Sequence, residues 1–157
     1  MIRGRPHEAP DEAFLIDAQR SFSVEPSNPL LRSIRALLLF YGGDFEQAVS
    51  LLQEVLAQHP NLHGVRPLLA MCLTAQGEPA AALAELNDDV RRTASVDPDI
   101  AYGVASVYAE QGLLDDAFDW LRRSIALGNS NKFWFEHDPN LQSLREDARF
   151  AEMIESM

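Results

Sequence analysis

Cysteine and lysine are almost missing from this sequence, which has one of each, Cys72 and Lys132, among 157 residues. A single cysteine cannot form a disulfide within the chain, and such usage is consistent with a reducing compartment. Apolar runs are short, as in residues 36–41, whereas a membrane-spanning helix needs about 20 apolar residues. The first residues lack the apolar stretch of a signal peptide, and no lipid-anchor motif is present. We therefore expect a cytoplasmic chain that does not associate with membranes.

Basic residues are scarce as well, with 13 Lys and Arg against 24 Asp and Glu, a formal net charge of −11 and a pI near 4.6. Nucleic acids and anionic membrane surfaces are bound by clustered basic residues, so both classes of partner are disfavoured. The charge is unevenly placed, because residues 1–43 are neutral and residues 44–157 carry the whole excess.

Motifs for catalysis and cofactor binding are missing. The only glycine pair, Gly42-Gly43, belongs to no phosphate-binding loop, and there is no HExxH, CxxC or EF-hand pattern. His59 and His63 are four residues apart, but Pro60 interrupts the helix that would align them as metal ligands. Cys72 lies in an apolar stretch and is interpreted as a core residue. We predict no catalytic residue, no metal and no cofactor, and hence a protein that is not an enzyme.

The sequence does contain an internal repeat, which is marked by Gly43, Gly77 and Gly112 at spacings of 34 and 35 residues. An alanine stands seven residues before and five residues after each glycine, giving Ala36, Ala48, Ala70, Ala82, Ala105 and Ala117. Apolar residues recur at three- and four-residue steps on both sides of each glycine, which predicts pairs of amphipathic helices. Glycine suits the turn between them, and paired alanines allow close packing.

This pattern resembles the tetratricopeptide repeat (TPR), a helix-turn-helix unit of 34 residues, over roughly residues 29–130. The resemblance implies an all-α fold, a right-handed α-solenoid of about three hairpins. We expect one domain over residues 1–157, built from an N-terminal helix and a C-terminal helical cap around three repeats, with bounds 10–22, 29–62, 63–97, 98–130 and 131–157. Arg35 and Asp89 stand where the family has apolar residues, and an irregular joint is expected over residues 88–92.

The last segment, residues 131–157, resembles the short helical endings that follow TPR arrays in many bacterial proteins. Terminal repeats need such a cap, because the last apolar face would otherwise lie in water. The aromatic run Phe133-Trp134-Phe135 leaves a second interpretation open, in which this segment is a separate docking site.

The resemblance implies a concave groove lined by the first helix of each hairpin, with five partner-binding candidates: Leu37, Phe40, Tyr41, Met71 and Tyr102. We predict a protein-interaction module, an adaptor, scaffold or chaperone-like protein, whose partner carries apolar anchors. The residues with which some TPR proteins clamp a terminal carboxylate are not matched. In size, acidity and build the chain is similar to small bacterial TPR chaperones of secretion systems. The alternatives are a self-associating structural protein, hence a homo-oligomer, or an accessory subunit of a larger assembly.

Overall fold

The computed structural model describes residues 28–157, so the helix expected over residues 10–22 lies outside the described part. The described chain folds into helices without strands, which confirms the predicted all-α class. The α-helices are α2 (Pro29–Tyr41), α3 (Phe45–Gln58), α4 (Arg66–Ala75), α5 (Pro79–Glu85), α6 (Asp88–Ala94), α7 (Pro98–Glu110), α8 (Leu114–Ala126), α9 (Lys132–His137), α10 (Gln142–Arg145) and α11 (Ala148–Glu155). Two short 3₁₀ helices, η1 (His63–Val65) and η2 (Pro139–Leu141), precede α4 and α10.

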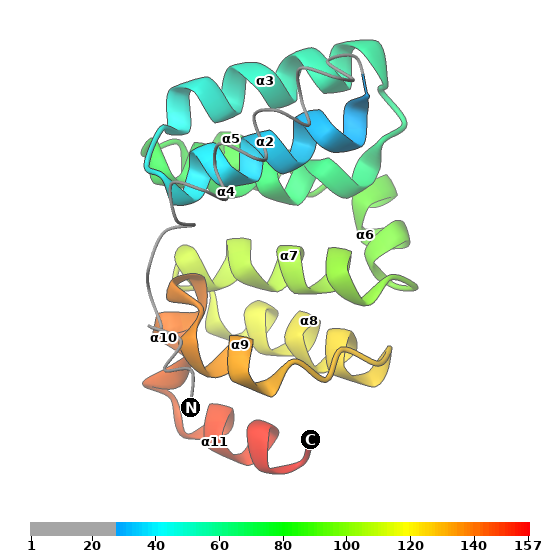
Figure 1. The fold of residues 1–157 in the computed structure, drawn as a ribbon. Coiled ribbons are helices and arrows are strands. Elements are labelled where there is room, and N and C mark those ends of the chain that lie inside the picture. Colours follow the sequence, from blue (N-terminus) through cyan, green and yellow to red (C-terminus); the bar gives the residue numbers. More distant parts are fainter. Residues whose placement is uncertain (1–27) are drawn as a thin grey trace, which may run out of the picture.

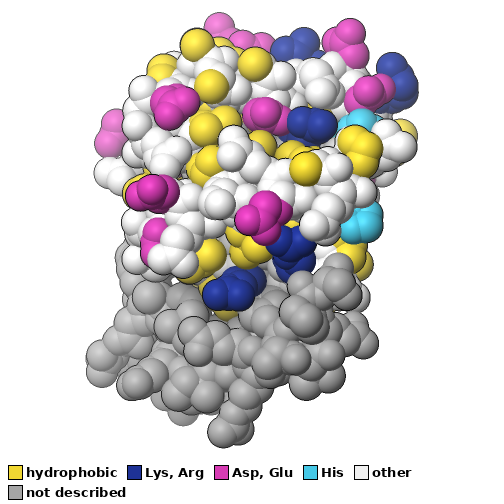
Figure 2. Space-filling view, turned by 90° about the horizontal axis from the view of Figure 1, so that it is seen from above, with side chains coloured by type: hydrophobic (Ala, Val, Ile, Leu, Met, Phe, Trp, Pro, Cys, Tyr) yellow, Lys and Arg dark blue, Asp and Glu magenta, His cyan; other side chains and the backbone are white. Residues whose placement is uncertain are grey.

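Three hairpins, α2–α3, α4–α5 and α7–α8, follow one another in a stack, and the C-terminal helices lie at its far end (Figure 1). Helix α4 packs against both α3 and α7, so the second hairpin joins the other two. Figure 2 shows the end of the stack near α3, where side chains of both charges are scattered among hydrophobic ones. None of the helices in residues 28–157 combines the length and apolar character needed to cross a membrane.

The turns within the hairpins share one geometry. Gly43, Gly77 and Gly112 have φ values of 83°, 82° and 72°, a left-handed conformation that glycine adopts without steric cost. In the first turn the Asp44 N–H donates to the Leu39 carbonyl at 2.9 Å and the Gly43 N–H donates to the Phe40 carbonyl at 3.0 Å, which is a Schellman motif. The same bonds recur at the other two glycines. Each turn therefore satisfies the carbonyls at the end of the preceding helix.

The six repeat alanines lie where the paired helices approach each other, and each has 0% relative exposure. The core continues through the large side chains beside them, for example Leu52, Leu86 and Leu121, which are at most 2% exposed. Arg35, which departs from the family pattern, is exposed on α2.

The second hairpin has a divided second helix. Helix α5 ends at Glu85, and α6 begins at Asp88, because the Asn87 side chain accepts a hydrogen bond from the Val90 N–H at 3.0 Å and caps the new helix. This restart turns Val90 and Ala94 into the core, each 0% exposed, and leaves Asp89 in solvent. The irregularity thus lies just before residues 88–92, which are themselves helical.

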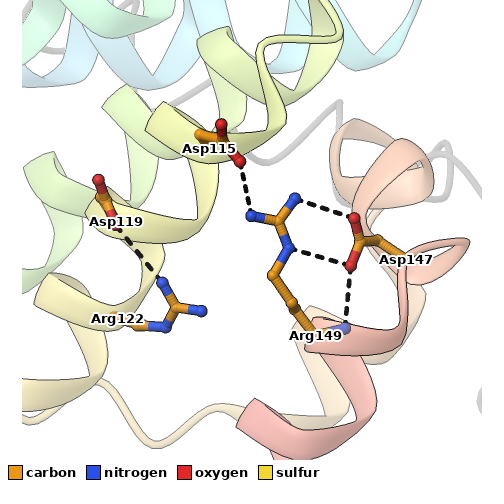
Figure 3. A network of polar contacts seen from close by, with 5 residues as sticks. All are labelled: Asp115, Asp119, Arg122, Asp147 and Arg149. Atoms are coloured by element: carbon orange, nitrogen blue, oxygen red, sulfur yellow. Dashed lines mark hydrogen bonds and ion pairs between the residues drawn. The ribbon is translucent and has the colours of Figure 1, made fainter.

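The C-terminal helices cover the last hairpin with six apolar side chains that are at most 7% exposed: Phe135, Leu141, Leu144, Phe150, Met153 and Ile154. A polar network pins α11 to α8 (Figure 3). Arg149 donates to Asp115 at 2.6 Å and to Asp147 at 2.9 and 3.1 Å, and its guanidinium lies 4.5 Å from the centre of the Phe118 ring. The segment therefore acts as the cap that a repeat array needs.

Candidate functional site

A groove of about 690 Å³ opens along the first helices of the three hairpins. Helix α2 forms one wall with Leu30, Ser33, Ile34, Leu37 and Tyr41. Helix α4 and η1 supply Gly64, Val65, Pro67, Leu68 and Met71, helix α7 supplies Asp99, Ile100, Tyr102, Gly103 and Ser106, and the cap supplies Trp134, Asp138 and Asn140. A volume of this size accommodates several side chains of a ligand.

The wall formed by α2 is unusual because it exposes a row of large apolar side chains. Leu30, Ile34 and Leu37 are 61%, 47% and 37% exposed. Their spacing of four and three residues places them on one face of the helix. Asn28 starts α2 at this position by accepting a hydrogen bond from the Leu30 N–H at 2.9 Å. An exposed apolar row of this kind makes α2 a candidate for contact with an apolar ligand.

The floor of the groove depends on a close approach of two helices. A Cβ atom added to Gly103 in α7 would lie 3.0 Å from the Cβ atom of Pro67 in α4. Glycine at this position therefore lets the two helices meet beneath the groove. Met71 lies on the same floor and is 6% exposed, so its side chain does not project into the groove.

Aromatic rings join the third hairpin and the cap to the groove. The Tyr102 ring stacks on Phe135 with centroids 5.1 Å apart and planes inclined by 12°. Trp134 meets Tyr41 edge to face at 6.2 Å, so it connects the cap to the end of α2. One end of the groove is thus closed by rings from two hairpins and the cap.

Asp138 is the polar centre of this closed end and is 0% exposed. Its carboxylate accepts hydrogen bonds from the Tyr102 hydroxyl and from the Asn140 N–H, the latter at 3.0 Å. Arg145 donates to the Asp138 carbonyl at 2.7 Å. Burial raises the pKa of Asp138 above the ordinary carboxyl value, and the hydrogen bonds from Tyr102 and Asn140 together with the positive charge of Arg145 partly oppose the rise. Burial and the nearby Asp138 carboxylate also raise the pKa of Tyr102. The Tyr102 hydroxyl therefore stays protonated and donates a hydrogen bond to Asp138.

Glu110, at the end of α7, lies near this network without joining it. Its Oε1 atom is buried and has no hydrogen-bond partner among residues 28–157. Burial raises its pKa to about 8, and the charge of Asp138 adds to the rise, so most Glu110 side chains are protonated at neutral pH. Burial, followed by the charge of Glu110, raises the pKa of the Cys72 thiol to about 12. Cys72 is fully buried and is therefore a poor nucleophile.

Four of the five partner-binding candidates from the sequence, Leu37, Tyr41, Met71 and Tyr102, line the groove together. Phe40 does not. It is 8% exposed and packs against Phe45 and Tyr41, with ring centroids 5.7 and 5.2 Å apart. Adjacent residues on a helix point about 100° apart, so Tyr41 faces the groove while Phe40 turns into the hairpin.

The contribution of the cap to the groove was missed by the sequence analysis. The aromatic run divides among three environments, because Phe135 is 0% exposed in the core, Trp134 lines the groove, and Phe133 is 60% exposed and stacks on His137. Phe135 thus belongs to the cap, and docking at Phe133 or Trp134 stays a prediction. The three consecutive aromatic residues indicated that this segment has a special role. The sequence did not show which of the three rings would face the groove.

A metal ion in this groove would need several ligating side chains close together. In the described part of the chain, no group of three or more His, Cys, Asp or Glu side chains is placed to hold a metal ion. The groove is apolar along α2 and α4 and carries carboxylates on α7 and in the cap.

Comparison with known proteins supports the repeat assignment. Two family models described as tetratricopeptide repeat match the chain, one over residues 39–95 and the other over residues 68–132. No curated protein matches it. Tetratricopeptide repeats generally serve as protein-interaction modules without catalytic activity of their own. The chain belongs to the tetratricopeptide repeat family.

Proposed function

We propose that this protein is an adaptor or chaperone-like interaction module whose concave groove binds an apolar segment of a partner protein. The observation that carries the proposal is the exposed row Leu30, Ile34 and Leu37, which faces a groove large enough for several side chains. A surface of this kind is costly to leave in water unless a ligand covers it.

The exposed row supplies a substantial part of the binding free energy. Fully burying one Leu or Ile side chain is worth about 2 kcal/mol. Because the three side chains are already partly covered, covering the rest gains about 3 kcal/mol, or roughly a hundredfold in affinity. The floor around Met71 and the rings of Tyr41 and Trp134 add further contact.

Affinity capture from a lysate of the source organism tests the proposal with the variant Ile34→Glu/Leu37→Glu. Both side chains are solvent-exposed, so the charges disturb the groove without entering the core. The matched control is Val96→Glu/Leu113→Glu, which alters two apolar side chains, 73% and 39% exposed, outside the groove lining. We expect partners retained by wild type and control to be lost from the groove variant. Undiminished capture by a folded groove variant would refute the proposal.

Self-association is the second candidate function, and the exposed Phe133 at the cap is the observation that favours it. Light scattering over a hundredfold range of concentration distinguishes the two. A mass that rises with concentration, and falls for Phe133→Ser, would support a self-associating protein. A monomer at every concentration would leave the groove as the interaction surface.

A further inference from the structure

Among the described residues, the lining of the groove contains two carboxylates, Asp99 and Asp138, and no lysine, arginine or histidine. Asp138 is fully buried, and its carboxylate is occupied by Tyr102 and by the Asn140 N–H. Asp99 is exposed, and no side chain of residues 28–157 forms a hydrogen bond or ion pair with its carboxylate. The groove thus has one carboxylate that is accessible to a ligand.

Asp99 is not needed to cap the helix on which it lies. It is the second residue of α7, and the Asp97 carboxylate already accepts the N–H groups of Asp99 and Ile100, at 2.9 and 3.0 Å. The helix N-terminus contributes only about half a positive charge, which two full negative charges outweigh. The start of α7 therefore carries two carboxylates, and of these two Asp99 lines the groove.

The surroundings of Asp99 suit a long side chain with a charged tip. Ile100 follows it in the groove lining, and Gly64 lies against Ile100 from the neighbouring hairpin. Lysine and arginine lay their aliphatic stems on apolar surface while the charged group reaches a polar site. A basic side chain can therefore cover Ile100 and place its cation at the Asp99 carboxylate.

Two basic side chains of the described residues have partners other than Asp99. Arg66 in α4 forms an ion pair with Glu85 at 2.7 Å, and Arg123 in α8 donates to the Ser95 carbonyl at 2.6 and 3.0 Å; neither lines the groove. Residues 28–157 contain 19 acidic and 10 basic side chains, so the long-range field also attracts a cationic ligand.

We propose that the partner segment carries a lysine or arginine beside its apolar anchors, and that Asp99 binds this cation while α2 and α4 bind the anchors. The inference rests on the proposed function of the groove. It further specifies that the partner segment is positively charged and that Asp99 is the residue that binds this charge. Apolar contacts provide most of the affinity, and the ion pair selects the register of the segment.

A phage-displayed library of random dodecapeptides, selected on the purified chain, provides the test. We expect enriched peptides to combine two or three large apolar residues with a lysine or arginine at a fixed spacing. For a synthetic peptide of this kind, Asp99→Lys should weaken binding about fivefold, since it reverses a partly exposed ion pair. Asp116→Lys is the matched control, because it makes the same charge change in the first turn of α8, outside the groove, and should change binding less than twofold.

The outcomes separate the inference from the groove proposal. Peptides that need Ile34 but contain no basic residue, or whose affinity is unaffected by Asp99→Lys, would overturn the inference and leave the groove as the binding site. Peptides that bind equally well to Ile34→Glu would refute the groove proposal itself. A wild-type dimer that Ile34→Glu converts to a monomer would show that a second copy occupies the groove, and it would also overturn the inference.

Discussion

Replacing Glu110 by glutamine is expected to change how the stability of this protein depends on pH. In the unfolded chain the carboxyl group ionises near its ordinary pKa of 4.5, whereas in the folded chain burial and the charge of Asp138 raise that pKa to about 8. Between these values the folded state binds more protons than the unfolded state, so stability falls as the pH rises. Below pH 4.5 both states are protonated at this site, and the penalty vanishes.

The magnitude follows from the separation of the two pKa values. Each pH unit between them costs about 1.4 kcal/mol of unfolding free energy. The accumulated penalty is about 3 kcal/mol at pH 7 and about 5 kcal/mol above pH 8. Glutamine has nearly the same shape but no charge, so Glu110→Gln removes this part of the pH dependence. Any other effect of the amide on the unfolding free energy is the same at every pH.

Urea unfolding followed by circular dichroism, at intervals from pH 5 to pH 9, measures the effect. The difference in unfolding free energy between Glu110→Gln and wild type should grow in favour of the variant by about 1.4 kcal/mol per pH unit up to pH 8. The exposed Glu152, replaced in the same way, is the control for loss of a surface charge. Parallel pH profiles for wild type and Glu110→Gln would refute the reasoning, because they would show that burial at residue 110 does not shift the carboxyl.

Two further predictions concern packing. Gly103→Ala should destabilise the chain by about 1–3 kcal/mol in the same urea assay, because the added Cβ lies 3.0 Å from Pro67 and must push α4 and α7 apart. An unchanged urea midpoint would show that the two helices can separate at no cost in stability. Arg149→Ala should lower the melting temperature more than Arg122→Ala. Arg149 joins α11 to α8 and lies 4.5 Å from the centre of the Phe118 ring, whereas Arg122 forms its ion pair with Asp119 inside α8. Equal changes in melting temperature would show that Arg149 does not hold α11 to α8.

Hairpins and turns were predictable because their determinants are local. A left-handed residue between two helices calls for glycine, and small residues are needed where helices touch, so both leave a periodic trace in the sequence. A fourth turn of this kind, at Gly128 with a φ of 111°, was missed because the cap that follows it does not continue the repeat. The break in the second hairpin was expected over residues 88–92 but lies just before them. The helix starts there because the Asn87 side chain caps it, and the polar residues that follow are part of the helix.

The groove was predictable in part for a similar reason. Residues of α2, α4 and α7 keep their positions relative to the turn glycines, and this placed Leu37, Met71 and Tyr102 on one surface. The closed end was not predictable, because the bond between Tyr102 and Asp138 joins residues 36 positions apart through the packing of the cap. From the sequence alone, Asp138 is expected to lie on the surface, because aspartate is almost never fully buried without a partner.

The contact between the cap and α2 gives this array a property that open solenoids lack. In a linear stack each repeat interacts with its neighbours alone, so the ends can fray or flex independently. Here Trp134 meets Tyr41 at a ring distance of 6.2 Å, and Asn140 donates to the Tyr41 hydroxyl at 3.5 Å across 99 residues of sequence. Residues of α9 and of η2 in the cap therefore contact the end of α2 at one end of the groove. Since the cap also packs on the third hairpin, we expect these contacts to couple the unfolding of α2 to that of the cap and to limit changes in the width of the groove.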